Sequence, residues 1–308
     1  MCLGVCQVET GNGISRCAGF RVNKEGIEGP LEKLKAVRGE VVEYQLQVGD
    51  RTIGLNRLVG KGLEIRFLDQ ISCRNCAAPS RKSYGGGYCY PCFKKLAQCD
   101  LCVMSPDRCH YAQGTCREPD WGDEFCMQPH LVYLANSSGA KVGLTRLGYE
   151  IGRWMDQGAT QALPILKTPT RHIAGLTEVA LAQHLTDRTD WRALVSRDAP
   201  LVDLTQLREK LRNQVRDLPV EAVWLEDASE EQFRYPVASY SPTLERLRLD
   251  DDGLIHGALL GIKGQYLIFD TGVFNVRQHT SYLVSARGLE RPPTPPELKS
   301  NDQMELFS

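Results

Sequence analysis

Apolar and polar residues alternate through residues 36–72, as they do in β-strands that bury one face. The stretches EVVEYQLQVGD, RTIGLNRLVG and LEIRFLDQISC follow one another, with glycine-containing turns between them. Residues 254–285 return to the same pattern. Both ends of the chain therefore carry strands, and they can share one small β unit with the other segments inserted between them.

Residues 131–197 show a mixed pattern that predicts a small α/β domain. LVYLA and KVGLTR predict two short strands joined by NSSGA, YEIGRWMDQ predicts a helix, and ALPILK predicts a third strand. LTEVALAQHL predicts an amphipathic helix. The apolar side of this helix consists of Leu176, Val179, Ala180, Leu181 and Leu185.

These patterns together predict an α+β protein, with a zinc-binding module at the centre of the chain. The expected segments are an N-terminal β region (1–72), a cysteine-rich zinc module (73–130), the α/β domain (131–197), a helical connector (198–253), a C-terminal β region (254–287) and a polar, Pro-rich, disordered tail (288–308).

Charge and hydropathy narrow the classes of partner. The net charge of −1 gives no sign of nucleic acid, but the negative charge lies in the C-terminal third, so the total can hide a basic face elsewhere. No apolar run is long enough to cross a bilayer, and the N-terminus lacks the basic and apolar regions of a signal peptide. We expect a cytoplasmic protein with no membrane partner.

Nine of the twelve cysteines lie between residues 73 and 126. In a reducing compartment such clustering favours metal thiolates over disulfides. Cys73-x-x-Cys76 and Cys89-x-x-Cys92 can present four thiolates to one tetrahedral zinc ion, although two redox dithiols are an alternative. The three cysteines without this spacing are interpreted as ordinary thiols: Cys2, Cys6 and Cys17.

A second group of cysteines predicts a second zinc ion. Its members are Cys99, Cys102, Cys109, Cys116 and Cys126, with His110 and His130 nearby. Cys99-x-x-Cys102 forms a third knuckle, and the other ligand pair stays open among the later three cysteines. Four protein ligands leave no position for a water molecule, so both zinc ions are expected to be structural. Metal binding would offset the ordering entropy of a segment too poor in apolar residues to build a core.

Basic and aromatic residues interleave around the first knuckles. The candidate nucleic-acid-binding residues are Arg81, Lys82, Tyr84, Lys94 and Lys95. Basic groups neutralise phosphates, and aromatic rings stack on unpaired bases. The alternative is that the aromatic rings cover the metal and the basic side chains are merely solvated.

A tyrosine, an arginine and a glutamate fall in order along the α/β segment: Tyr133, Arg153 and Glu178. A phenolate can activate water, an arginine can offset charge on a phosphate, and a carboxylate can hold a divalent cation. Mg²⁺ suits a site with one carboxylate, waters and phosphate oxygens. Taken singly, each of the three residues also fits an ordinary structural role.

In this order the residues resemble the core of GIY-YIG nucleases. LVY stands where that family has GIY, and KVG stands where it has YIG. Lys141 replaces the second tyrosine, as in a phage-associated branch that reads KIG, and Gln157 stands where many members have a histidine. The resemblance implies a nuclease that uses Mg²⁺ or Mn²⁺ held by Glu178. The implied catalytic residues are Tyr133, Lys141, Arg153, Glu178 and His184.

Over nearly its full length the chain also resembles the bacterial family domain of unknown function 2797. The stretches that carry this resemblance are GYCYPCF, CHYAQGTCREPDWG, KVGLTR, RWMDQGA and GIKGQYLI. It implies little about function.

The last residues resemble the QxxLF-type peptide with which bacterial proteins bind the DNA polymerase sliding clamp. The expected contact residues are Gln303, Leu306 and Phe307. Glutamine supplies hydrogen bonds, leucine and phenylalanine fill an apolar pocket, and a Pro-spaced tail lets the peptide reach its groove. A chance match of five residues is the alternative.

The sequence thus predicts a zinc-stabilised, nucleic-acid-acting protein with a GIY-YIG-like core. The leading hypothesis is a divalent-metal-dependent DNA endonuclease in replication or repair. The alternative is a zinc protein that binds DNA or RNA without cleaving it, because Lys141 interrupts the nuclease motif.

Overall fold

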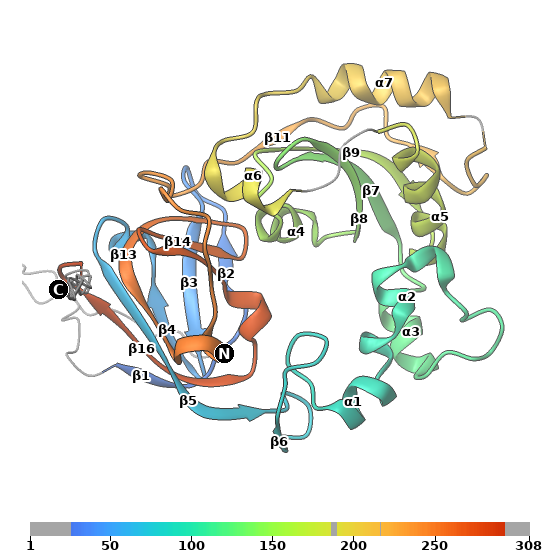
Figure 1. Cartoon of the computed structure of the whole chain (residues 1–308). Coiled ribbons are helices and arrows are strands. Elements are labelled where there is room, and N and C mark those ends of the chain that lie inside the picture. The colour runs from blue at the N-terminus through green and yellow to red at the C-terminus, as the bar shows by residue number, and fades with distance from the viewer. Residues whose placement is uncertain (1–25, 186–189, 216, 293–308) are drawn as a thin grey trace, which may run out of the picture.

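The computed structural model describes residues 26–185, 190–215 and 217–292. The chain forms three parts, arranged in an arc in Figure 1: a β domain, a cysteine-rich segment and an α/β domain. The protein is therefore a mixed α+β protein with several sheets. The residues outside this description include Cys2, Cys6, Cys17 and the clamp-type peptide with Gln303, Leu306 and Phe307.

An eight-stranded sheet joins the two ends of the chain. Its order is β1 (Ile27–Pro30), β16 (Tyr282–Leu289), β5 (Gly62–Ser72), β13 (Leu254–Lys263), β14 (Tyr266–Phe269), β15 (Gly272–Asn275) and β12 (Arg246–Leu247), with β6 (Pro79–Ser80) paired to β5. Ile65 of β5 pairs with Ile255 on one side and with Ala286 on the other, both antiparallel. The ends of the chain thus share one β unit, as the two strand-rich segments predict.

A separate three-stranded sheet completes the β domain. Its strands are β2 (Lys35–Val37), β3 (Glu43–Val48) and β4 (Arg51–Gly54). Tyr44, Leu46 and Val48 of β3 are buried and alternate with less buried residues, which is the expected pattern for a strand with one face in a core.

The cysteine-rich segment has only short helices and little core of its own. The helices are α1 (Tyr90–Lys95), η2 (Ala97–Cys99), α2 (Leu101–Met104), η3 (Pro106–Arg108) and α3 (Pro119–Phe125). Between residues 97 and 129 only Ala97, Pro106, Gly122 and Cys126 are buried. So little buried apolar surface cannot offset the entropy of ordering this segment.

The α/β domain is built on a five-stranded sheet with β7 (His130–Asn136) near its centre. The order is β10 (Val223–Trp224), β9 (Gln161–Thr168), β7 and β8 (Ala140–Arg146), and β11 (Glu231–Gln232) also pairs with β9. All seven residues of β7 are buried. The helices of this part are α4 (Glu150–Asp156), α5 (Arg171–Ala182), α6 (Trp191–Ser196) and α7 (Leu204–Gln214); η1 (Asn56–Leu58), α8 (Leu249–Asp252) and η4 (Val276–His279) belong to the β domain.

Alternate residues of β7 face two different cores. Val132 and Leu134 pack with Leu181 of α5 and Leu211 of α7. Tyr133 lies on the opposite face, in a cluster that also contains Trp154 of α4 together with Leu46 and Leu267 of the β domain. The α/β domain and the β domain therefore share one continuous core around Tyr133.

Two expected elements differ in the structure. The second helix begins at Arg171 rather than at Leu176, because the Thr170 hydroxyl accepts a hydrogen bond from the N–H of Ile173 and caps the helix. The expected helical connector contains α7 but also β10, β11 and β12, each only two residues long. Strands of two residues are too short to carry a detectable period.

The cysteine-rich segment docks on α5 through a backbone contact at Gly175. A Cβ atom at this position would lie 2.5 Å from the backbone nitrogen of Asp107 and 2.6 Å from the carbonyl carbon of Pro106. Gly175→Ala is therefore expected to destabilise the protein by about 1–3 kcal/mol through overpacking, despite the better helix propensity of alanine. Urea unfolding monitored by circular dichroism measures this change.

Gly152 of α4 supplies the matched control, because it is also helical but a Cβ atom there would meet nothing within 4 Å. Gly152→Ala is expected to raise the free energy of unfolding by up to about 1 kcal/mol. Equal effects of the two substitutions would contradict the close docking at Gly175.

No helix among the described residues is both long and apolar enough to span a lipid bilayer.

Candidate metal centre and arginine cleft

Two knuckles bring four cysteine sulfurs together at the end of β5. The sulfur atoms of Cys73, Cys76, Cys89 and Cys92 all lie within 4.8 Å of one another. We call this group the first metal centre. In the first knuckle, the N–H of Ala77 donates to the Cys73 carbonyl at 2.8 Å, and Ala77 has φ of 57°, so the chain turns sharply around the sulfurs. In the second knuckle, Cys89 precedes α1 directly and Cys92 lies within it.

The four thiols cannot all ionise easily without a cation. Burial raises the pKa of Cys73, but backbone N–H groups of the knuckles outweigh it and lower the pKa to about 6. For Cys92 the Asn75 amide lowers the pKa, whereas burial and the three neighbouring thiols raise it to about 12. A divalent cation between the sulfurs removes this repulsion. The residues thus fit zinc, which four thiolates bind in tetrahedral geometry.

Aromatic rings surround the first metal centre. Tyr88 is buried in a cluster with Cys73 and Cys89, and Phe93 packs against that cluster. The Tyr84 ring lies 5.9 Å from Phe93, centroid to centroid. This arrangement favours the interpretation that the aromatic residues cover the metal.

The predicted basic residues of this segment, Arg81, Lys82, Lys94 and Lys95, are exposed and are not among the residues that line the two clefts described below. Their predicted role in nucleic-acid binding stays a prediction.

The remaining cysteines of the segment are not grouped as the predicted third knuckle requires, because Cys99 and Cys102 lie in different surroundings. Cys99 packs against the first metal centre without joining its four sulfurs. Cys102 lies instead beside Asp100 and His110. Together with Cys109, Cys116 and Cys126 it lines a small cavity. Asp100 lies between the two cysteines and caps α2, so η2 and α2 carry them into different surroundings.

An open cleft lies where the three parts of the protein meet. Its volume is about 770 Å³. The α/β domain contributes Arg146, Arg153, Arg171 and Glu178, with Leu144 and Thr145 at the sheet edge. The cysteine-rich segment contributes Ser83, Gly85, Gly86, Val103, Met104 and Pro106, and the C-terminal β region contributes Asn275, Arg277 and Gln278. We call it the arginine cleft, because four arginines and one acidic residue line it.

A second cleft of about 1020 Å³ adjoins the arginine cleft and shares Thr145, Arg153 and Arg277 with it. Arg74 and Tyr149 also line this second cleft. The Arg146 guanidinium carbon lies 4.6 Å from the centre of the Phe125 ring and 4.0 Å from that of the Tyr149 ring. These two cation–π contacts hold the guanidinium beside the cleft.

Glu178 and Arg171 are both half-buried where they line the arginine cleft. Burial raises the pKa of Glu178, and Arg153 and Arg171 lower it without cancelling the effect of burial. The Arg171 Nη2 atom donates to the Val103 carbonyl at 2.8 Å, but its buried Nε has no hydrogen-bond partner among the described residues. A divalent cation in the cleft would stabilise the Glu178 carboxylate.

Tyr133 lies behind the cleft and is not open to it. Its side chain is 0% exposed, and its hydroxyl donates to Gln157 Oε1 at 2.8 Å. Burial raises the pKa of Tyr133, and the opposing effects of Arg153 and Gln157 do not cancel this. A Cβ atom on Gly143 would lie 2.8 Å from the Tyr133 hydroxyl, so the glycine is required for the ring to pack here. The phenol therefore fits a role in positioning Arg153 better than one in activating water.

The other two predicted catalytic residues lie in different surroundings. Lys141 of β8 pairs with Ala135 of β7 and is half-buried. Its side chain is on the same face of the sheet as Tyr133. His184 is exposed beyond the end of α5 and is not among the described residues that line the arginine cleft.

The comparisons with known proteins identify the family. A family model described as "Protein of unknown function (DUF2797)" matches residues 60–284. The chain belongs to this family. No curated protein and no solved structure matches the chain. The DUF2797 match contains the first metal centre and every residue of the arginine cleft.

Several residues that line the arginine cleft of this DUF2797 chain were not predicted from the sequence. Arg171 precedes the stretch predicted as helix, and Arg277 lies in a segment predicted only as strand. Neither residue belongs to a sequence motif that would mark it as part of a site, because the cleft forms only when η4 and α5 come together in the fold.

Proposed function

We propose that the protein binds the phosphodiester backbone of a nucleic acid in the arginine cleft. The observation that carries this proposal is the convergence of Arg146, Arg153, Arg171 and Arg277 on one open cleft with a single acidic residue. Guanidinium groups bind phosphate oxygens through paired N–H donors and keep their charge at every physiological pH. The formal net charge of −1 does not oppose this, because the arginines are concentrated on one face.

The resemblance to GIY-YIG nucleases supports a second, catalytic function in the same cleft. The order β7, β8, α4, β9 and α5, with Tyr133 opposite Gly143, agrees with that resemblance. In this reaction Glu178 would hold Mg²⁺ or Mn²⁺, and Arg153 would offset charge on the phosphate. Glu178 favours this function specifically, because it is the one carboxylate among the residues that line the arginine cleft.

Tyr133 would act through Arg153 in this mechanism. Its buried hydroxyl contacts Gln157 and Arg153, and its raised pKa disfavours the phenolate that a general base requires. Glu178 would hold the divalent cation, and the chemistry that the cation would supply is a lower pKa for a nearby water molecule.

Fluorescence anisotropy with labelled single-stranded DNA, duplex DNA and RNA of one sequence tests binding. Arg277→Ala is expected to weaken binding about tenfold and to reduce the slope of log K against log salt by about 1, as loss of one phosphate contact would. Arg234→Ala is the matched control, because Arg234 carries the same charge, is 74% exposed in an ion pair with Glu40 and lines neither cleft. An equal loss in both variants would contradict a specific cleft.

Cleavage is tested separately with the same substrates in Mg²⁺ or Mn²⁺. Glu178→Gln is expected to abolish cutting while leaving binding in EDTA within about twofold, because the amide keeps the shape of the side chain but is a poor cation ligand. Binding without cutting by the unmodified protein would leave the binding function and remove the catalytic one.

A further inference from the structure

Four cysteines outside the first metal centre surround one small cavity. They are Cys102, Cys109, Cys116 and Cys126, and with His110, Asp100 and neighbouring apolar groups they line a space of about 20 Å³. This volume is close to that of a single small ligand such as one water molecule or one ion. The cavity is nearly apolar apart from the sulfurs and the groups at its edge, so a water there would lack good partners.

Separate local structures carry these four cysteines to the wall of the cavity, where no three of their sulfurs lie as close to one another as those of the first metal centre. Cys102 is in α2, and Cys109 follows η3, where its N–H donates to the Pro106 carbonyl. Cys126 ends α3, and its carbonyl accepts a hydrogen bond of 2.8 Å from the N–H of Arg171. A Cβ atom at Gly122 would lie 3.0 Å from the Tyr111 ring and, at ordinary contact distance, 3.5 Å from the Cys116 sulfur, so α3 lies directly beside that cysteine.

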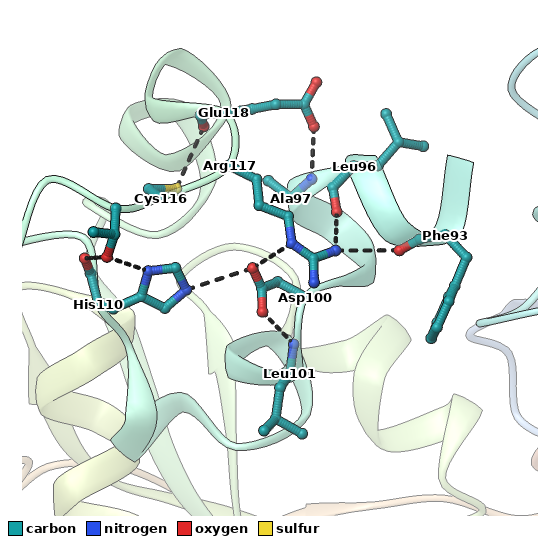
Figure 2. A network of polar contacts seen from close by, with 10 residues as sticks. Phe93, Leu96, Ala97, Asp100, Leu101, His110, Cys116, Arg117 and Glu118 are labelled. Carbon is teal, nitrogen blue, oxygen red and sulfur yellow. Dashed lines mark hydrogen bonds and ion pairs between the residues drawn. The ribbon is translucent and has the colours of Figure 1, made fainter. Parts of the chain in front are cut away.

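The polar groups at the edge of the cavity are already engaged with one another (Figure 2). An Asp100 carboxylate oxygen accepts from Arg117 Nε at 2.7 Å and lies 3.4 Å from His110 Nε2. His110 Nδ1 lies 2.9 Å from the Thr115 hydroxyl. Arg117 also donates to the carbonyls at Phe93 and Leu96, so the network ties α1 to the loop that carries Cys116.

We propose that Cys102, Cys109, Cys116 and Cys126 bind a second zinc ion. Thiolates are strong zinc ligands, and four of them complete a tetrahedral, structural site with Zn–S distances of about 2.3 Å. In this arrangement Asp100, His110 and Arg117 brace the segments around the metal and do not bind it. Cys99, which the spacing of the third knuckle would include, lies with the first metal centre and is not a ligand of the second.

The competing ligand set is the close group formed by Asp100, Cys102 and His110, whose ligand atoms lie within 4.8 Å of one another. In this set His110 Nε2 already lies 3.4 Å from the Asp100 carboxylate oxygen that accepts from Arg117, so a metal would have to come between these two groups. The two sets share Cys102, so only substitutions of the other members distinguish them.

Metal content of the purified full chain, measured by native mass spectrometry, tests the proposal. The unmodified protein is expected to carry two zinc ions, and Cys116→Ser is expected to carry one. His110→Ala and Cys99→Ser are the matched controls, and both are expected to keep two. One zinc ion in the unmodified protein, two in Cys116→Ser, or one in His110→Ala would each overturn the ligand set.

Cadmium-113 NMR of the unmodified protein gives a second test that does not depend on the folding of a variant. Two resonances in the range of all-sulfur coordination are expected. A second resonance at the position of mixed sulfur, nitrogen and oxygen coordination would favour Asp100, Cys102 and His110 instead. Neither result depends on nucleic-acid binding, so the second metal site and the proposed function can fail separately.

Discussion

Cys89→Ser is expected to remove the metal from the first centre and to unfold the chain around both knuckles. Cys89 is buried and belongs to the four sulfurs within 4.8 Å of one another. Structural zinc sites contribute about 10–16 kcal/mol of binding free energy, which is as large as the whole stability of a typical domain. The region has few buried apolar side chains with which to offset that loss.

Hydrogen-exchange mass spectrometry together with zinc quantification measures this effect. Amide protection is expected to fall across residues 73–96, and one equivalent of zinc is expected to be lost. Cys99→Ser is the matched control, because Cys99 is a neighbouring cysteine of the same segment but not one of the four. Unchanged zinc content in Cys89→Ser would rule out this centre.

Trp154→Ala is expected to destabilise the protein by about 3–5 kcal/mol, the range for removing a large aromatic side chain from a core. Trp154 is 2% exposed, and its ring lies 5.7 Å from Tyr133 and 6.3 Å from Phe233 between ring centres. It belongs to the core that the α/β and β domains share. The loss is therefore expected to loosen both domains together, which chemical unfolding followed by fluorescence and circular dichroism would show as one transition.

Trp154→Phe separates packing from hydrogen bonding at the same position. The indole Nε1 is buried and has no hydrogen-bond partner among the described residues. Phenylalanine removes this N–H while keeping most of the buried ring, so its cost is expected to be well below that of alanine. Equal costs for both variants would mean that the aromatic contacts with Tyr133 and Phe233 contribute little.

Periodicity predicted the elements that are long enough to show a period. The hairpin of β7 and β8, helix α4 and strand β9 lie where the pattern of apolar residues placed them. The start of α5 was missed because its first turn begins with Arg171 and His172, and only the cap at Thr170 marks it. The two-residue strands β10, β11 and β12 form because larger neighbours offer them partners, which is a tertiary effect.

The same distinction between local sequence signals and tertiary effects applies to the candidate sites. The first metal centre was predictable because a CxxC pair is a local signal. Cys99 was assigned to the second group from the same spacing, but the cap at Asp100 separates it from Cys102. The arginine cleft could not be predicted as a whole, since Arg171 of α5 and Arg277 of η4 lie far apart in the sequence and line one cleft only because the α/β domain packs against the β domain.

The position of β5 between β13 and β16 also has a consequence for synthesis. This strand of eleven residues leaves the ribosome early, but both of its neighbours emerge only after the cysteine-rich segment and the α/β domain have been translated. Pairing between such distant residues is slow, and a strand with two open edges invites intermolecular pairing while it waits. The edges of β5 must therefore be protected from intermolecular pairing until β13 and β16 have been synthesised.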